Sequence, residues 1–434
     1  MRKSFAFAPL CLFLILVPAF HSAVAQSTAA AMKSHPIEPT NFSFECVNQS
    51  VCGPNAPDGS TWITTTSQPG TVRLWDAGTS WANLQTGTGA YNWTTLDSWL
   101  DMVAAHQPAA VIYSFGHVPC FISNVPCSPQ SQGNSKYWSY GPPTDLVAGG
   151  SATFTSFVTA LTTHCSPAGN CVKTYIKYWE MWNEPNLSHY WSGTVNQLYN
   201  MFKPAVAIIR ANVPEAKVST PPISGGDTTY VASWLALENT NGKLSDYYGF
   251  HSYLYGYEPE IRISQIEHMV NAKNVAGWTT IPWMNTETNF SVSTNVCTST
   301  AEDCDGQIVR WHVLQYAYQG GGGGAFHVGW YNWPSISSGG YDTYYYTMMQ
   351  WLSGAAFSAS CSSSGTIWTC PLTEASGASA LIVWNTAGNS SYTPATEYLD
   401  YREFNGTYGG ATEKISAGQS TTIGLIPIMF ESAK

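Results

Sequence analysis

The sequence predicts a (β/α)8 barrel followed by a small β-sandwich, and three observations lead to this fold class. From about residue 42 to residue 354, strand-like runs alternate with helical patterns, which is typical of a parallel sheet with helical crossovers. Eight candidate strands occur in this region, and eight parallel strand–helix units favour a closed barrel. After Gly354, short strand-like runs alternate with Gly, Asn and Ser turns, which favours a β-sandwich.

Each candidate barrel strand is a short run rich in β-branched, aromatic or other apolar residues. The runs cover residues 42–46, 72–75, 109–114, 175–182, 217–220, 247–250, 281–285 and 325–328. A doubly wound open sheet is the alternative, but it usually carries a glycine-rich nucleotide loop after its first strand, and this sequence has none there. The glycines at 320–324 precede a strand, and no Lys-Ser/Thr follows them as it would in a phosphate-binding loop. We therefore interpret them as a turn.

The helical segments are recognised by apolar residues that share one face. In residues 94–106, Thr94 and Asp97 have the spacing of a capping box, and the apolar face holds Leu96, Trp99, Leu100, Val103 and Ala104. Further helical patterns cover residues 154–161, 195–210 and 341–352. In the C-terminal region, we expect strands at 380–384, 396–401 and 423–430.

The first residues indicate export. Arg2 and Lys3 precede an apolar run, and the Ala-Val-Ala sequence at 23–25 forms a small-residue cleavage site. The run is shorter than the ~20 apolar residues of a membrane span, which argues against a transmembrane anchor. We therefore expect a secreted protein with a signal peptide at 1–25, a linker at 26–40, the barrel at 41–354 and the β-sandwich at 355–434.

The cysteines agree with export. Of the 11 cysteines, Cys11 lies in the expected signal peptide, and the others form five neighbouring pairs. An even number in an exported chain suggests disulfide bonds, and none of the pairs has the Cys-x-x-Cys spacing of a zinc site. Sequence leaves the connectivity open, and we predict local pairing: Cys46 with Cys52, Cys120 with Cys127, Cys165 with Cys171, Cys297 with Cys304, and Cys361 with Cys370.

Composition argues against two classes of partner. Charged residues make up 10% of the chain, against about 25% in a typical domain. The formal net charge of −10 would repel nucleic acid and anionic lipid. Aromatic residues make up 14%, which suits a large core and also favours stacking on sugar rings. We expect a monomer that needs no cofactor and binds neither nucleic acid nor membrane.

Two glutamates at the ends of predicted strands carry the candidate chemistry. Glu184 ends the fourth strand and Glu287 ends the seventh, so the barrel would bring both to one mouth. Such a pair can cleave a glycosidic bond, because one carboxyl protonates the leaving oxygen while the other attacks the anomeric carbon. At a separation of roughly 5–5.5 Å, the reaction retains the configuration. Glu180, on the same strand face as Glu184, is expected inside the barrel or paired with a base.

The segment Trp182-Asn183-Glu184-Pro185 resembles the acid/base signature of glycoside hydrolase clan A, in which Asn-Glu ends strand four and a second Glu ends strand seven. Segments 73–76 and 89–97, together with Trp81, are similar to the start of family 39-like barrels, and family 5 enzymes are also similar. The likeness covers about residues 71–354. The first strand departs from the pattern, because it lacks the expected Phe-Gly start.

This resemblance implies roles for five residues around the reacting bond. Glu184 would act as general acid and then as general base, and Glu287 would be the nucleophile. Asn183 would bind the sugar 2-hydroxyl. Arg73 would lie beside Glu287 and keep it ionised, and Tyr253 would donate a hydrogen bond to the same carboxylate.

Four further residues are candidates for lining the site. His251 belongs to the same His-x-Tyr motif as Tyr253. Trp330 would be the platform on which the sugar stacks, with Trp333 as the rival candidate. His117, after the third strand, could contact the sugar or hold its own loop.

Other functions remain open or are disfavoured at this point. A transglycosylase would use the same two carboxylates, and a catalytically inactive carbohydrate-binding barrel would share the fold. A serine hydrolase is disfavoured because the chain has no Gly-x-Ser-x-Gly motif. A metal site is not expected, because the chain has no His-Glu-x-x-His. The resemblance favours a β-type bond in a glucan, a xylan or an exopolysaccharide as the substrate.

Overall fold

In the computed structural model, the described residues are 36–45, 70–106, 110–125, 127, 138–291, 297–331, 341–404 and 410–433. The predicted signal peptide, Trp333 and the predicted Cys46–Cys52 pair lie outside these residues. None of the helices in the described ranges combines the length and the apolar character that a bilayer span requires.

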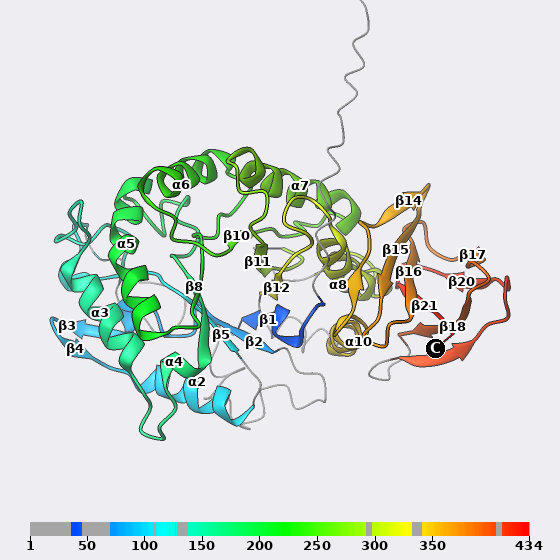
Figure 1. Cartoon of the computed structure of the whole chain (residues 1–434), viewed down its shortest axis with the longest axis horizontal. Helices are drawn as coiled ribbons and strands as arrows, with labels where there is room; N and C mark the ends of the chain where they lie inside the picture. The colour runs from blue at the N-terminus through cyan, green and yellow to red at the C-terminus, as the bar shows by residue number, and fades with distance from the viewer. Residues whose placement is uncertain are drawn as a thin grey trace, which may run out of the picture. The chain divides into compact units, whose positions relative to one another are not determined.

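The chain forms an eight-stranded parallel barrel, as the sequence predicts (Figure 1). All eight predicted strands are present: β1 (Phe42–Glu45), β2 (Thr71–Leu74), β5 (Ala110–Ser114), β8 (Ile176–Glu180), β9 (Lys217–Ser219), β10 (Tyr248–His251), β11 (Trp283–Thr288) and β12 (His327–Trp330). They pair in chain order, and β12 pairs with β1. Parallel bridges from Ser219 to Tyr247 and from Ile223 to Phe250 close the barrel between β9 and β10.

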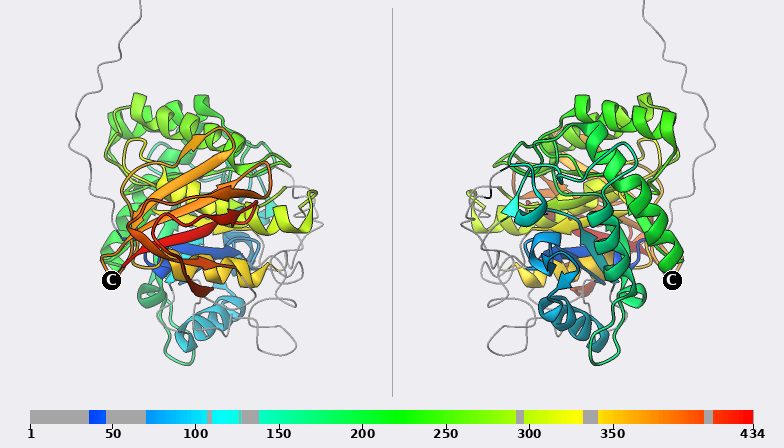
Figure 2. Two further views of the ribbon diagram at one scale, coloured as in Figure 1. Left: turned by 90° about the vertical axis from the view of Figure 1, so that its right-hand side faces the viewer. Right: turned by 90° about the vertical axis from the view of Figure 1, so that its left-hand side faces the viewer.

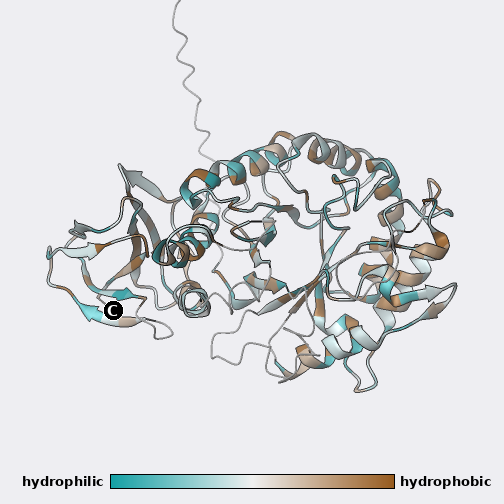
Figure 3. Cartoon of the chain, turned by 180° about the vertical axis from the view of Figure 1, so that it is seen from behind, coloured by the Kyte–Doolittle hydropathy of each residue, from teal (hydrophilic) through white to brown (hydrophobic). Residues whose placement is uncertain are grey.

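Helices between the strands cover the barrel from outside. They are α2 (Thr94–Ala105), α3 (Ala152–Thr163), α5 (Val195–Asn212), α6 (Thr228–Asn241), α7 (Pro259–Val275), α8 (Ala301–Ala317) and α10 (Asp342–Leu352), with the short helices α1 (Trp81–Leu84) and α4 (Val172–Tyr175). Figure 3 shows apolar and polar residues interleaved along these helices. The glycines at 320–324 lie between α8 and β12, which agrees with the predicted turn.

The predicted capping box at α2 is wrong. Trp93 occupies the N-cap position without a side-chain cap, and Thr94 is already helical. The Asp97 carboxylate instead lies 2.5 Å from Nε2 of His164, which stacks on Trp93. The spacing of Thr94 and Asp97 suits a capping box, but Asp97 pairs with the distant His164 instead of with the start of the helix. A capping box does occur at α5, between Thr194 and Gln197.

Aromatic rings fill the bottom of the barrel. The ring of Tyr247 lies 4.5 Å from that of Phe326, and Tyr178 lies 6.0 Å from Phe326. Nε2 of His327 lies 2.7 Å from the hydroxyl of Ser43, so the neighbouring strands β12 and β1 are also joined by a side-chain polar contact. This packing closes the lower end of the barrel, where the strands begin. Only the upper end, where the strands finish, can therefore form a site.

The C-terminal region is a β-sandwich, as predicted. Its larger sheet is antiparallel and consists of β13 (Ala356–Phe357), β14 (Ser362–Ser364), β15 (Ile367–Thr373), β16 (Ser379–Asn385), β18 (Tyr398–Glu403), β19 (Ala411–Lys414) and β21 (Ile428–Ser432). A ribbon of β17 (Ser390–Tyr392) and β20 (Thr421–Ile423) packs on it through Ile423 and Phe430. Figure 2 shows these strands in orange and red.

The single strand predicted at 423–430 is two strands, β20 and β21. Gly424 to Pro427 separate them, and Pro427 has no backbone N–H for a ladder. The turn lies against α8, because a Cβ atom on Gly306 would come within 2.3 Å of the Leu425 carbonyl oxygen. Only glycine allows the helix and this turn to approach so closely.

Four of the five predicted disulfide bonds lie within the described residues, and all four are formed. They join Cys120 to Cys127, Cys165 to Cys171, Cys297 to Cys304, and Cys361 to Cys370. The first three pin loops or a helix start of the barrel, and the last joins β15 to the segment before β14. Each bond therefore stabilises a local loop.

A buried ion cluster joins the helical layer to the β-sandwich. Arg310 of α8 is fully buried and forms ion pairs with Asp303, with Glu258 at 3.1 Å and with Glu260 at 3.3 Å. The indole N–H of Trp384, on β16, donates to Glu260 at 2.6 Å. Burial makes each of these contacts depend on the others, because a carboxylate without its cation would be strongly disfavoured here.

We therefore expect Arg310→Met to lower the free energy of unfolding by roughly 3–5 kcal/mol, because it leaves buried carboxylates unpaired. Lys414→Met is the control, since Lys414 is exposed and its ion pair with Asp400 should be worth less than ~1 kcal/mol. Equilibrium urea unfolding of both variants measures the difference. Similar small losses in the two variants would contradict a stabilising role for the cluster.

Candidate active site

The loop after β8 presents Glu184 at the upper end of the barrel. Trp182 and Glu184 both adopt left-handed backbone conformations, with φ of 84° and 43°. Such conformations are costly for residues other than glycine and need support from their surroundings. The buried Trp182 ring supplies this support, because its N–H donates to the Tyr190 carbonyl and the ring makes a T-shaped contact with Trp191. The strained loop thus fixes the direction of the Glu184 side chain.

Glu287 lies within β11, at a point where the register shifts toward both neighbouring strands. The shifts fall between Phe250 and His251 on one side and between Asn285 and Thr288 on the other. Irregularities of this kind re-aim side chains at the rim of a barrel. Here they bring Glu287 opposite His251 at the end of β10.

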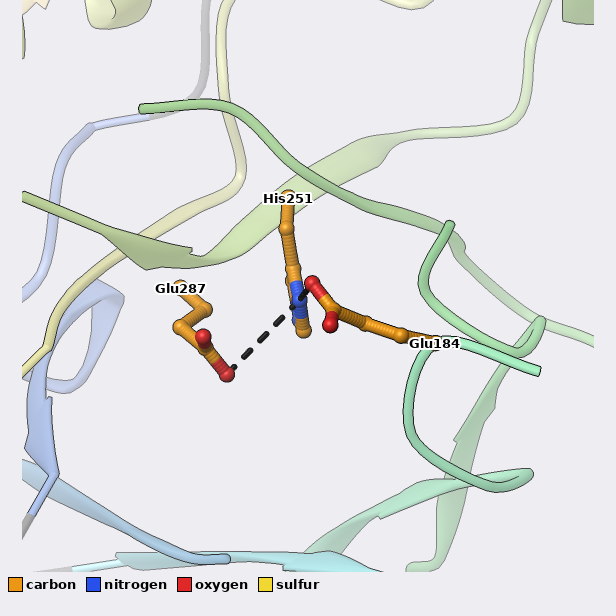
Figure 4. A group of neighbouring side chains, drawn as sticks. All are labelled: Glu184, His251 and Glu287. Atoms are coloured by element: carbon orange, nitrogen blue, oxygen red, sulfur yellow. Dashed lines mark hydrogen bonds and ion pairs between the residues drawn. The ribbon is translucent and has the colours of Figure 1, made fainter. Parts of the chain in front are cut away.

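Glu184 and Glu287 meet at His251, as Figure 4 shows. Nδ1 of His251 lies 2.8 Å from Oε1 of Glu184 and 3.6 Å from Oε2 of Glu287. One oxygen of each carboxylate and the His251 nitrogen all lie within 4.8 Å of one another. Two carboxyl groups this close are nearer to the roughly 5–5.5 Å separation found in retaining glycosidases than to the roughly 6.5–9.5 Å that leaves room for a water molecule in inverting ones. The same three groups could also bind a divalent cation.

Arg73 lies at the centre of the polar groups beneath this pair. Its Nη1 contacts Glu287 and Glu45, both at 2.7 Å, and its Nε contacts Glu180 at 2.8 Å. Its Nη2 donates to Oδ1 of Asn183 at 2.5 Å. Arg73 therefore lies beside Glu287, as expected, and Glu180 lies inside the barrel and pairs with a base, also as expected.

The other oxygen of Glu287 accepts a hydrogen bond from the hydroxyl of Tyr253. Burial, with the negative charge of Glu287, raises the pKa of Tyr253 well above its usual value. The phenol therefore stays protonated and remains a donor. Arg73 and Tyr253 together hold both oxygens of Glu287, so its carboxylate has a fixed orientation.

Glu45, at the end of β1, is a site residue that the sequence analysis missed. Burial raises its pKa well above the ordinary value, and repulsion from Glu287 and Asp76 adds to this effect, although Arg73 opposes it. One guanidinium cannot neutralise three buried carboxylates, so Glu45 binds a proton more readily than a free glutamate. The rule that strand ends build the site could have identified it.

His251 governs the charge of Glu184. Burial raises the pKa of Glu184, but the hydrogen bond and charge of His251, with help from Ser224 and Arg73, bring it below the ordinary value. When His251 carries a proton, Glu184 is thus kept ionised.

The predicted stacking role of Trp330 is wrong. Trp330 is fully buried and points out of the barrel, with its ring stacked on His312 of α8 and against Phe290. Side chains alternate along a strand, and Gly329 occupies the inward position. Tyr331 follows and lies within 6.4 Å of the Tyr253 ring, so the aromatic residue at this end of β12 is a tyrosine.

Two aromatic groups flank the carboxylates. In one group, the ring of Trp75 lies 4.8 Å from that of His117 in a tilted contact and makes a T-shaped contact with Tyr190 at 5.6 Å. Tyr253 and Tyr331 form the other group. Burial lowers the pKa of His117 to about 3, so this residue is neutral. His117 thus packs at the site as part of an aromatic wall, and Tyr190 is a second residue that the sequence analysis missed.

Comparisons with known proteins bear on the fold. A scan against models of known families found no match, and neither did a search of curated proteins. Solved structures do match. A family 39 glycoside hydrolase from Bacteroides cellulosilyticus is 12% identical with a TM-score of 0.62, over 91% of this chain and 81% of that one.

Two further structures extend the likeness. A family 30 subfamily 8 xylanase from Clostridium acetobutylicum is 13% identical, with a TM-score of 0.60, and a family 39 β-xylosidase from Caulobacter crescentus is 13% identical, with a TM-score of 0.59. Each match covers 93% of this chain and 98% of the other. The chain has the fold of family 39 and family 30 glycoside hydrolases.

Asp76, just after β2, provides a test of the site's electrostatics. Burial and repulsion from Glu287 and Glu184 raise its pKa to about 7, although Arg73 opposes this. In the unfolded chain the carboxyl loses its proton near pH 4. The folded state binds the proton more tightly, so the stability contribution of Asp76 is complete below pH ~4 and is lost as the pH rises to about 7.

We expect Asp76→Asn to match the wild type in stability at pH 4 and to exceed it at pH 8, by about 1–4 kcal/mol after allowance for partial exposure. Asparagine tolerates the left-handed backbone at this position, where φ is 53°. Thermal melts at several pH values measure the difference, with the exposed Glu413→Gln as control. A difference that does not change with pH would contradict the repulsion.

Proposed function

We propose that this protein is a secreted retaining glycoside hydrolase that cleaves β-glycosidic bonds of a poly- or oligosaccharide. The observation that carries the proposal is the pair Glu184 and Glu287, with oxygens within 4.8 Å of each other at the mouth of a closed barrel. The shared fold with family 39 and family 30 glycoside hydrolases supports it. We also propose the domain limits expected from the sequence, 41–354 and 355–434.

In the first step, Glu287 attacks the anomeric carbon and forms a glycosyl ester. The leaving oxygen takes a proton from Glu184 as its bond to the sugar breaks. Arg73 and Tyr253 hold the two oxygens of Glu287 in position before the attack. His251 provides the proton that Glu184 delivers, because a proton on Nδ1 of His251 can pass to Oε1 of Glu184 across 2.8 Å.

In the second step, Glu184 accepts a proton from water, and the resulting hydroxide cleaves the ester with a second inversion at the same carbon. The net result is retention of configuration. Asn183 accepts from Arg73 through its Oδ1, which leaves its amide N–H groups to donate to the sugar 2-hydroxyl. Tyr190 and Tyr331 are the aromatic side chains that we assign to contact the sugar faces.

Export rests on two observations. Residues 1–25 have the pattern of a signal peptide. The four disulfide bonds suit an oxidising compartment outside the cytosol. The substrate class that we propose is a β-linked glucan, xylan or exopolysaccharide. The two enzymes named above as a xylanase and a β-xylosidase make xylan the first polymer to try.

The first experiment measures new reducing ends from β-glucans, xylans, mannans and bacterial exopolysaccharides. We expect wild-type activity on at least one polymer, and a loss of roughly 10³-fold or more in Glu287→Ala. Glu413→Ala, an exposed glutamate on β19, is the matched control and should keep full activity. Equal activity in wild type and Glu287→Ala would refute the nucleophile assignment. Products longer than the substrate would favour the transglycosylase, and binding without cleavage would favour the inactive barrel.

A second experiment separates the roles of the two glutamates. With an aryl glycoside whose phenol leaves without protonation, Glu184→Ala should release a rapid burst of one phenol per enzyme and then turn over slowly, because only the second step needs its base. Glu287→Ala should give no burst. Stopped-flow absorbance measures both variants, and a burst from Glu287→Ala would reverse the assignment.

A third experiment tests the cation alternative at Glu184, His251 and Glu287. Dialysis against EDTA should leave the activity unchanged, because the two carboxylates and His251 carry the chemistry by proton transfer and covalent attack. Added Zn²⁺ should inhibit, since it would occupy the same three groups. Loss of activity in EDTA with recovery on adding a metal would favour a metalloenzyme.

A further inference from the structure

Tyr255 is an exposed aromatic residue that the proposed mechanism does not use. It lies in the turn between β10 and α7, at the end of the barrel that carries the two glutamates, and 37% of it is exposed. Its backbone is left-handed, with φ of 54°, a conformation that is costly for a tyrosine. Because the ring is only partly buried, packing offsets little of this cost. Residues held in this way tend to lie at functional sites.

Backbone hydrogen bonds hold the turn in this conformation. The N–H of Leu254 donates to the carbonyl of Asn289 at 3.0 Å, and the N–H of Gly256 donates to the carbonyl of Phe290 at 3.2 Å. Both acceptors belong to the segment that follows β11. The position of Tyr255 is therefore fixed relative to the end of β11, which carries the nucleophile.

Arg262, on α7, fixes the ring of Tyr255. Its guanidinium lies 5.0 Å from the centre of the ring, in a cation–π contact, and its Nε donates to the carbonyl of Tyr253 at 2.9 Å. Because Arg262 covers one face, the exposed surface of the ring lies on the side away from this arginine. A rigid aromatic surface of this kind suits the flat face of a sugar ring, because little freedom is lost when the sugar binds.

Tyr255 forms one end of a row of three tyrosine rings across the mouth of the barrel. The ring of Tyr253 lies 5.8 Å from that of Tyr255 and 6.4 Å from that of Tyr331. Among the described residues, Tyr255 and Tyr331 make no ring contact with each other, so Tyr253 lies between them. The hydroxyl of Tyr253 donates to Glu287. The middle of the row is thus in direct contact with the nucleophile.

The loop after β9 places Tyr255 on the side of the general acid. The N–H of Glu184 donates to the carbonyl of Pro222, in this loop, at 3.1 Å. Two residues further along, the side chain of Ser224 interacts with both Glu184 and Tyr255. The loop lies between the ends of β8 and β10, whereas Tyr331 follows β12 on the far side of β11. The two ends of the row therefore lie on opposite sides of the catalytic pair.

The chemistry assigns different sugars to these two sides. A general acid protonates the oxygen of the departing sugar, so that sugar lies beside the acid, whereas the nucleophile lies against the sugar that becomes the ester. An aromatic surface beside Glu184 is accordingly placed to contact the departing sugar.

We propose that Tyr255 is the platform on which the departing sugar stacks, so that the substrate is a chain that continues past the cleaved bond on the side of Glu184. The proposal rests on the proposed function, because it takes Glu184 as the general acid. It makes Tyr255 a specificity-determining residue that favours a sugar over a small leaving group.

Substrates with different leaving groups test this assignment. The probes are cello-, xylo- and manno-oligosaccharides and the β-fluorides of the same sugars. On the oligosaccharide that the wild type cleaves, Tyr255→Ala should lower kcat/KM by roughly 10- to 100-fold, because it removes an apolar contact with the departing sugar. On the matching fluoride, it should lower kcat/KM by less than about 3-fold, because fluoride leaves that position empty. Equal losses on both substrates would overturn the proposal.

Two further variants separate the ring from the fold of the turn. Tyr255→Phe keeps the ring and should keep kcat/KM on the oligosaccharide within about 3-fold of the wild type. Tyr257→Ala is the matched control, because Tyr257 lies in the same turn, is 54% exposed and makes no ring contact with Tyr253 among the described residues. A loss in Tyr255→Phe or in Tyr257→Ala as large as that in Tyr255→Ala would overturn the proposal. Thermal melts check that each variant is folded.

Binding can also be measured without turnover. Glu287→Gln should be retarded in native gels that contain the β-glucan, xylan or mannan that the protein binds. Tyr255→Ala/Glu287→Gln should lose most of this retardation, and Tyr257→Ala/Glu287→Gln should keep it. Equal retardation of the two double variants would overturn the proposal.

The two measurements distinguish a failure of this proposal from a failure of the proposed function. Retardation that depends on Tyr255, in a protein whose wild type cleaves no oligosaccharide, polymer or fluoride, would reject the hydrolase and keep the sugar platform. Cleavage of an oligosaccharide that is unchanged in Tyr255→Ala would keep the hydrolase and reject the platform. Neither cleavage nor retardation with any of these probes would reject both.

Discussion

The arrangement of the site depends on one buried cation, Arg73. Its guanidinium contacts Glu45 from β1, Glu180 from β8 and Glu287 from β11, and it also holds Asn183 in the loop after β8. These groups come from four parts of the barrel, so a single planar side chain sets their relative positions. Guanidinium suits this task because its donors have fixed directions and it keeps its charge at every relevant pH.

The excess of carboxylates over cations gives the site its chemical character. Because Arg73 cannot neutralise all of its neighbours, burial raises the pKa values of Glu45 and Asp76, while His251 lowers that of Glu184. Carboxyl groups with different proton affinities are therefore packed close together. The raised pKa values fall on Glu45 and Asp76 and not on Glu184, so delivery of a proton by Glu184 would depend on its hydrogen bond with His251.

The helical layer shows why sequence patterns identified some helices and not others. α2 and α3 have one buried face, so their apolar residues recur at helical spacing. α8 is buried on nearly all sides, and its buried residues include Asp303, Arg310 and His312. Its buried polar side chains bond to α7 and to its own carbonyl groups, although Nε of Arg310 and Nε2 of His312 have no partner among the described residues. Because polar residues lie on its buried sides, no amphipathic pattern marks this helix in the sequence.

The sequence alone determined the eight barrel strands, the β-sandwich, the local disulfide bonds of the described loops and the two strand-end glutamates. These features follow from local signals, namely apolar periodicity, cysteine spacing and the rule that strand ends meet at one mouth. Tertiary structure alone decided that Trp330 faces outward while Tyr331 stays at the mouth, and that Glu45 and Asp76 join the site. The physical reason is that side-chain direction and proton affinity depend on register shifts and on charges brought together from distant strands.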